Sequence, residues 1–138
     1  MKEVLYRGKR IDNDEWITGM PWIFSPPIKK ALIVSAMGLV GEDDGVSRYC
    51  ESDEVHPETI GQFTGGVDKA GKRIFEADIV QGICDLTGEL IIGYVEYYPQ
   101  TMKYCVHSND NIVGLSRCRN IKVIGNIYDN SELLEVGE

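Results

Sequence analysis

The fold class is decided by residues 89–98, which have the sequence ELIIGYVEYY. Leu90, Ile92, Tyr94, Glu96 and Tyr98 fall on one face of an extended chain, and Ile91, Val95 and Tyr97 on the other. Alternation rich in β-branched and aromatic residues is typical of a β-strand. Gly93 in the middle indicates a bend or the close approach of another backbone, and Pro99 ends the strand.

The sequence that follows this strand also predicts β-structure. Residues Met102–His107 alternate, Asn109-Asp110-Asn111 is expected to be a loop, and Ile121–Tyr128 is expected to be the last strand. Side chains of residues 129–131 can cap free N–H groups, so a short helical turn is expected at Glu132–Glu135.

The sequence that precedes it predicts a strand at Asp78–Cys84 and a hairpin before that. The arms of this hairpin are Thr59–Thr64 and Lys72–Phe75. Between them, Asp68 and Gly71 occupy the first and fourth positions of a type I turn, where Gly71 can take a positive φ.

The N-terminal part predicts a second hairpin, with strands at Val4–Ile11 and Trp16–Met20 joined by turn residues 12–14. Pro21, Pro26 and Pro27 are expected to break the stretch that follows. Residues 28–40 suit either one helix face or a buried strand, and we favour a strand at 31–36.

Residues 41–58 hold seven acids and one base. A run of like charge is usually a solvated loop, so we expect at most a short strand near Val46–Glu51. The acids could gather a hard cation such as calcium, but they lack the alternating positions and closing Glu of known loops. The acids considered for such a site are Glu42, Asp43, Asp44, Asp53 and Glu54.

These elements add up to eight to ten strands and one short helix. The expected fold is therefore all-β and mainly antiparallel, barrel-like or a sandwich, with a short C-terminal helical turn. Residues 1–58 form an N-terminal hairpin with a variable acidic loop region, and residues 59–138 a barrel-like core, unless the two are one continuous domain.

Composition excludes several classes of function. The net charge of −8 argues against broad electrostatic binding to nucleic acid, which needs a basic surface. No apolar run has the roughly 18 residues of a membrane span, and no signal peptide is visible, so the expected location is the cytoplasm of the host cell. The four cysteines form no CxxC pair, and neither GxxxxGK[ST] nor GxGxxG occurs, so we predict no metal and no cofactor.

Cys105 and His107 fall on one face of a strand. Residues two apart in a strand are separated by about 7 Å, which is too far for a direct thiol–imidazole hydrogen bond. No strand–turn–helix nucleophile elbow accompanies them. We therefore predict no catalytic residues and a protein that is not an enzyme.

Basic residues near aromatic ones are the remaining candidates for contact with a partner. Both basic clusters lie in expected hairpins, and barrel folds can stack the bases of a single strand on aromatic rings beside a basic groove. The simpler interpretation is that these cations pair with the protein's own acids. The candidate contact residues are Arg7, Lys9, Arg10, Trp16, Lys72 and Arg73.

Three blocks resemble the YopX family, whose members are small proteins carried by phages and prophages of Gram-positive bacteria. Residues 7–10 (RGKR) with Trp16 and Gly19 resemble the family's opening. Residues 55–80, VHPETIGQFTGGVDKAGKRIFEADIV, follow its longest motif, and residues 123–135, VIGNIYDNSELLE, follow its closing one. Ala77 stands where the family usually has Gly, which makes a positive φ there less expected, and Ser131 stands where it usually has Pro.

The resemblance implies a mostly β, barrel-like fold and a phage setting, and it supplies no activity, cofactor or catalytic residue. Sheet edges pair readily with other chains. We therefore expect a non-enzymatic module that binds a protein partner or its own copies. The alternative is an accessory protein that binds single-stranded nucleic acid.

Overall fold

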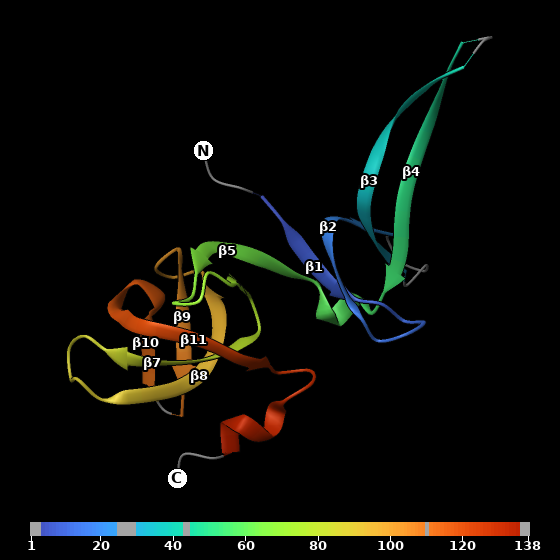
Figure 1. Cartoon of the computed structure of the whole chain (residues 1–138). Coiled ribbons are helices and arrows are strands. Elements are labelled where there is room, and N and C mark those ends of the chain that lie inside the picture. Colours follow the sequence, from blue (N-terminus) through green and yellow to red (C-terminus); the bar gives the residue numbers. More distant parts are fainter. Residues whose placement is uncertain (1–3, 25–29, 43–44, 110, 136–138) are drawn as a thin grey trace. The chain divides into compact units, whose positions relative to one another are not determined.

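The computed structural model describes residues 4–24, 30–42, 45–109 and 111–135, and within 37–49 it describes the backbone alone. These residues form eleven strands and three short 3₁₀ turns, arranged as antiparallel sheets that do not close into a barrel (Figure 1). The predicted all-β, mainly antiparallel class is confirmed. No helix in the described part of the chain is long and apolar enough to cross a membrane.

The first sheet has the hydrogen-bonded order β4-β3-β2-β1-β5-β6. Its strands are β1 Tyr6–Lys9, β2 Trp16–Ile23, β3 Ala31–Glu42, β4 Gly45–Val55, β5 Gly61–Val67 and β6 Arg73–Phe75. The second sheet has the order β10-β9-β8-β7-β11. Its strands are β7 Asp78–Cys84, β8 Leu90–Tyr98, β9 Lys103–Ser108, β10 Asn111–Gly114 and β11 Cys118–Asn126. The 3₁₀ turns are Pro57–Thr59, Leu115–Arg117 and Ser131–Glu135.

The chain divides into two compact units. One comprises the described residues up to Gln62, and the other comprises the described residues from Phe63 onward. The division falls inside β5, whose first two residues pair with β1 and whose later residues pair with β6. These are the N-terminal and the C-terminal unit.

Each unit has its own apolar core. In the N-terminal unit the buried residues are Ala31, Ile33 and Val55, packed with Tyr6, Ile17 and Ile60. In the C-terminal unit they are Ile74, Val80, Val95, Val106 and Val123. The close backbone approach expected at Gly93 is confirmed, because a Cβ there would lie 2.3 Å from the carbonyl oxygen of His107.

The acidic stretch 41–58 was expected to be a loop with at most a short strand near Val46–Glu51, and the strand is longer than predicted, because it covers Gly45–Val55. These residues form β4, which pairs with β3 from Ala31↔Val55 to Glu42↔Gly45. A strand places successive side chains on opposite faces, so the acids can stay in water while the backbone pairs. Val55 is buried at the base of the hairpin. Asp43 and Asp44 lie outside the described residues.

Strand β2 continues through Pro21, where a break was expected. The Phe24 N–H donates to the Lys30 carbonyl, so these two residues form a hydrogen-bonded pair at the end of the β2–β3 ladder. Hydrogen-bonded and non-hydrogen-bonded pairs alternate along an antiparallel ladder, and Pro21↔Ile33, three pairs further along, is therefore a non-hydrogen-bonded pair. The ring nitrogen of Pro21 therefore faces away from β3, on the side where pairing with β1 ends at Gly19. A proline that faces an open edge removes no ladder bond. Pro26 and Pro27 lie outside the described residues.

The expected loop at residues 109–111 is shorter than predicted, because Asn111 begins β10, which pairs with β9. Asp110 lies outside the described residues. The predicted turn at 68–71 is confirmed, with the Gly71 N–H donating to the Asp68 carbonyl and Gly71 at φ +84°. The short helical turn near the C-terminus is confirmed as Ser131–Glu135.

Candidate functional site

Arg7 and Trp16 are held together on one face of the β1–β2 hairpin. The register places Arg7 opposite Thr18 and Lys9 opposite Trp16, so Arg7, Lys9 and Trp16 share that face. The Arg7 guanidinium carbon lies 4.6 Å from the centre of the Trp16 ring, and Arg7 is buried. A cation over an indole face is a stabilising contact in its own right. This ring is therefore covered by the chain's own arginine.

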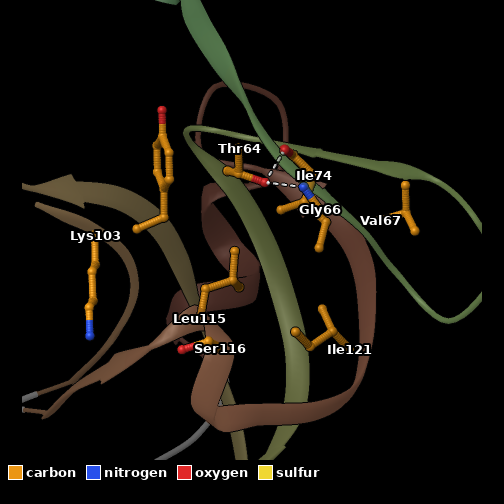
Figure 2. Close-up of a pocket in the computed structure, with 9 residues that line it drawn as sticks. Thr64, Gly66, Val67, Ile74, Lys103, Leu115, Ser116 and Ile121 are labelled. Atoms are coloured by element: carbon orange, nitrogen blue, oxygen red, sulfur yellow. Dashed lines mark hydrogen bonds between the residues drawn. The ribbon is translucent and has the colours of Figure 1, made fainter. Parts of the chain in front are cut away.

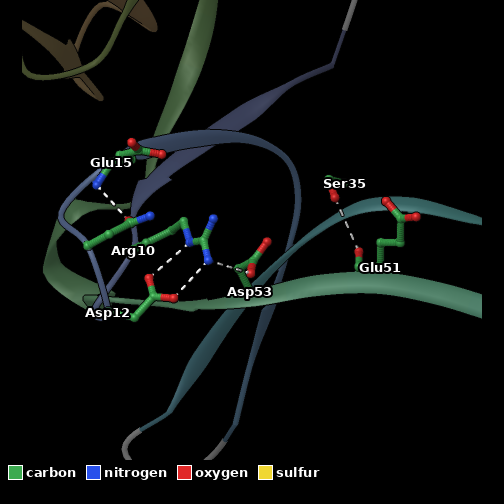
Figure 3. A network of polar contacts seen from close by, with 7 residues as sticks. Arg10, Asp12, Glu15, Ser35, Glu51 and Asp53 are labelled. Atoms are coloured by element: carbon green, nitrogen blue, oxygen red, sulfur yellow. Dashed lines mark hydrogen bonds and ion pairs between the residues drawn. The ribbon is translucent and has the colours of Figure 1, made fainter.

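Arg10 is engaged with acids of the N-terminal unit (Figure 3). Its Nε donates to Asp12 Oδ1 at 3.0 Å and its Nη2 to Asp12 Oδ2 at 2.7 Å, while Nη2 also lies 3.3 Å from Asp53 Oδ1. The hydrogen bonds with Asp12 raise the pKa of Arg10 and lower the pKa of Asp12. Arg10 therefore pairs with the protein's own acids, which was the simpler expectation.

Lys72 and Arg73 lie in the C-terminal unit, at the turn between β5 and β6. Lys72 is exposed, and its backbone N–H donates to Asp68 Oδ1. The Arg73 guanidinium carbon lies 5.7 Å from the centre of the Phe63 ring. In the other unit, Lys9 is half-buried and its backbone N–H donates to Thr59 Oγ1. The six candidate residues thus divide between the two units.

A cluster that sequence analysis missed lies on the β8–β9 ladder. Tyr94 is opposite His107, and Glu96 is opposite Cys105, so four chemically active side chains share one face. Nδ1 of His107 lies 3.1 Å from Glu96 Oε1 and 3.2 Å from the Tyr94 hydroxyl, and the two rings stack with centres 5.1 Å apart. Burial and the charge of Glu96 raise the pKa of Tyr94, so its phenol stays protonated. Cys105 and His107 were noticed in the sequence, and the facing strand supplies the carboxylate and the phenol.

The chemistry open to this cluster is limited by its thiol. Glu96 can orient the imidazole by accepting its Nδ1–H, which is how a base is positioned in many hydrolases. The Cys105 thiol, however, is buried, and it donates weakly to the Lys103 carbonyl at 3.9 Å. We therefore interpret the cluster as a cross-strand polar network that joins β8 to β9.

A mostly apolar pocket of about 450 Å³ opens in the C-terminal unit. Its apolar lining comes from Ile74 on β6, Leu115 in the second 3₁₀ turn and Ile121 on β11, with Lys103 and Ser116 at polar positions (Figure 2). The Thr64 hydroxyl donates to the Ile74 carbonyl and accepts from the Gly66 N–H, which fixes one wall. Its size is that of a small-molecule site, although its polar groups are not aimed at one point.

No group of three or more His, Cys, Asp or Glu side chains in the described residues could hold a metal ion. The acids that were weighed as cation ligands in the sequence, and not favoured, illustrate the reason. Asp53 is taken up by Arg10, and Asp43 and Asp44 lie outside the described residues.

The crystal structure of protein EF1440 from Enterococcus faecalis has a similar fold. The comparison covers 97% of this chain and 99% of that chain, with a TM-score of 0.62 and 21% sequence identity. A likeness at this level of identity shows the fold alone. No curated protein matches the chain.

Fold and site together define a two-unit, all-β protein. The sequence profile of the YopX protein family matches residues 6–135, which is nearly the whole chain. The chain belongs to the YopX family, as the three motifs in its sequence implied.

Proposed function

We propose that this YopX family member is a non-enzymatic protein-interaction or assembly module. It acts in the host cytoplasm, in the service of a phage or prophage, and its β3–β4 hairpin accepts an extended segment of another chain. The partner is a second copy of the protein or a different protein that offers a strand.

The edge of β4 supports this proposal. Strand β4 is the last in its sheet, and β3 is paired with β2 only from Ala31 to Val34 (Figure 1). The opposite edge of β4 is met only at its base, by the Arg10↔Val55 bridge and by the Ile11 N–H, which donates to the Glu54 carbonyl. In the described residues, backbone groups of β4 from Gly45 to Asp53 therefore have no neighbouring strand on that side. Open edges of this kind are templates for strand addition.

The charges on β4 indicate what kind of segment fits. Glu51 is exposed and Glu54 is half-buried, whereas Asp53 is already paired with Arg10. A partner strand with Lys or Arg at facing positions would be attracted, while like charges directly opposite destabilise a ladder. The net charge of −8 also attracts a basic partner at longer range.

Proline substitutions on β4 test the edge. The Glu54 carbonyl faces outward, away from β3, because it accepts from the Ile11 N–H. Backbone groups of successive residues in a strand point to opposite sides, so the Ser52 N–H also faces outward and the Glu51 N–H faces β3. Ser52→Pro removes one outward donor and keeps the pairing with β3, whereas Glu51→Pro removes a bond inside the hairpin. Light scattering after size exclusion measures self-association. Capture from host lysate, followed by identification of the partner and measurement of its affinity, covers the other case.

We expect Ser52→Pro to weaken association at least about tenfold while circular dichroism and the melting temperature stay close to wild type. Glu51→Pro should lower the melting temperature. A strictly monomeric wild type that retains no partner contradicts the proposal. Specific binding of short single-stranded oligonucleotides at low salt, measured by fluorescence anisotropy, would favour the nucleic-acid alternative instead.

A further inference from the structure

Two of the free cysteines face each other across the β7–β11 ladder in the C-terminal unit. Cys84 ends β7 and Cys118 begins β11, and they are direct partners in the antiparallel register. The next pair of opposite residues, Asp85 and Arg117, is hydrogen-bonded, because the Asp85 N–H donates to the Arg117 carbonyl at 2.9 Å. Alternation makes Cys84↔Cys118 a pair without hydrogen bonds, with Cα atoms about 4.5 Å apart and side chains on one face.

That spacing lies within the range of Cα separations found in disulfides. The neighbouring Gly82 confirms the shared face, because a Cβ placed on it would lie 3.7 Å from the Cβ of Cys118. Rotation of the two side chains therefore suffices to bring the sulfurs together, without movement of the backbone.

Cys84 is buried and Cys118 is half-buried, so a peroxide reaches them through a local opening at this end of the ladder, where β7 ends and β11 begins. The surroundings make the two thiols unequal. Hydrogen bonds from the backbone and side chain of Thr87 and the backbone of Leu86, in the turn after β7, lower the pKa of Cys84. Burial raises the pKa of Cys118 to about 11, and its thiol donates to the Gly114 carbonyl at 3.6 Å. A thiolate is the nucleophilic form of cysteine, and a neighbouring thiol can resolve an oxidised one by giving up its proton as its sulfur attacks.

We propose that Cys84 and Cys118 form a reversible oxidation site for hydroperoxides. The Cys84 thiolate attacks one peroxide oxygen, the O–O bond breaks, and the products are Cys84 sulfenic acid and hydroxide. The Cys118 sulfur then attacks the Cys84 sulfur, the S–O bond breaks, and water leaves with the Cys118 proton. The net reaction turns two thiols and hydrogen peroxide into one disulfide and two waters, and an added dithiol reverses it.

The test begins with the reduced wild-type protein and hydrogen peroxide. We expect the intact mass to fall by two hydrogens, and peptide mapping without reductant to join the Cys84 and Cys118 peptides. The cross-link should raise the melting temperature by on the order of 10 °C, because it closes a long loop. Dithiothreitol should reverse both changes.

Variants separate the roles of the two cysteines. Cys118→Ser should stop at a Cys84 sulfenic acid that dimedone labels, and Cys84→Ser should give neither label nor cross-link. Cys105→Ser and Cys50→Ser are matched controls that keep the disulfide. The proposal is overturned if peroxide-treated wild type still alkylates at both Cys84 and Cys118, or if the mapped cross-link joins Cys105 or Cys50.

Discussion

Ala77 holds a backbone conformation that suits glycine. Its φ is +73°, its N–H donates to the Val95 carbonyl, and its carbonyl accepts from the Ile127 N–H. These two bonds tie the start of β7 to its surroundings, so the chain keeps the left-handed geometry although a Cβ is present. Strain of this kind costs a residue other than glycine roughly 1–2 kcal/mol.

Ala77→Gly should therefore stabilise the protein by about 0.5–1 kcal/mol, since relief of strain exceeds the added freedom of the unfolded chain. Urea denaturation measures the change. Ala70→Gly is the matched control: Ala70 is exposed and is not among the residues with positive φ, so its replacement should be neutral or slightly destabilising. Equal effects of the two substitutions would contradict the account of strain at Ala77.

Asp68 is a buried carboxylate that joins a turn to a distant strand. Its Oδ1 accepts from the N–H groups of Ala70 and Lys72, and its Oδ2 accepts from the N–H of Val123 on β11. The bond from Val123 is the largest cause that lowers the pKa of Asp68 below its ordinary value of 3.8. An unfolded carboxyl keeps the ordinary value, so this contribution to stability is present above pH 4 and is lost as pH falls through the lowered pKa.

Asp68→Ala should cost roughly 2–4 kcal/mol at pH 7, because three donors lose a charged acceptor. Asp68→Asn should cost less, since one amide oxygen can still serve the turn while the NH₂ group opposes the Val123 N–H. The difference between wild type and Asp68→Asn should shrink as pH is lowered from 6 to 2. Denaturation curves across that range test this, and a difference independent of pH would rule out the carboxylate as the cause.

At the scale of elements, the β8–β9 ladder depends on the absence of a side chain at Gly93. A Cβ there would lie 2.3 Å from the backbone oxygen of His107, which cannot move without opening the ladder. Gly93→Ala should therefore destabilise the protein by roughly 3 kcal/mol or more. Gly66→Ala is the control, because the nearest atom to its new Cβ would be 3.7 Å away. Thermal melts of both variants check the contrast.

The elements that could be predicted from sequence are those with a strong local signal. Strand β7 is rich in β-branched residues and the 68–71 turn has Asp and Gly at its first and fourth positions, and both lie where they were expected. The length of β4 was underestimated because its sequence is acidic, whereas backbone pairing with β3 holds it over Gly45–Val55. Strand β10 was missed because only four residues pair after a tight turn, in which Asn109 has a φ of +49°. Tertiary pairing overrides weak local preference in both cases.

At the scale of the whole molecule, the candidate site shows which contacts the amino-acid sequence alone does not predict. Cys105 and His107 could be placed on one strand face from their spacing, but the register with β8 brings Glu96 to His107. The basic residues were identified by charge, whereas their partners, Trp16 for Arg7 and Asp53 for Arg10, come from neighbouring strands. Periodicity predicts which face of a strand a residue occupies, but the register between strands determines which side chains it contacts.

Strand order in the second sheet also has a consequence for how the protein is made. The partner of β7 on one side is β8, a few residues later, but on the other side it is β11, which follows β8, β9 and β10 in the chain. A ribosome that has released residues only as far as Gly114 has thus produced a meander with β7 at its rim. At that moment Val123, whose N–H donates to Asp68 in the folded protein, is still inside the exit tunnel. Completion of this sheet therefore waits until β11 has left the ribosome, which lengthens the interval in which a chaperone can bind the unpaired edge of β7.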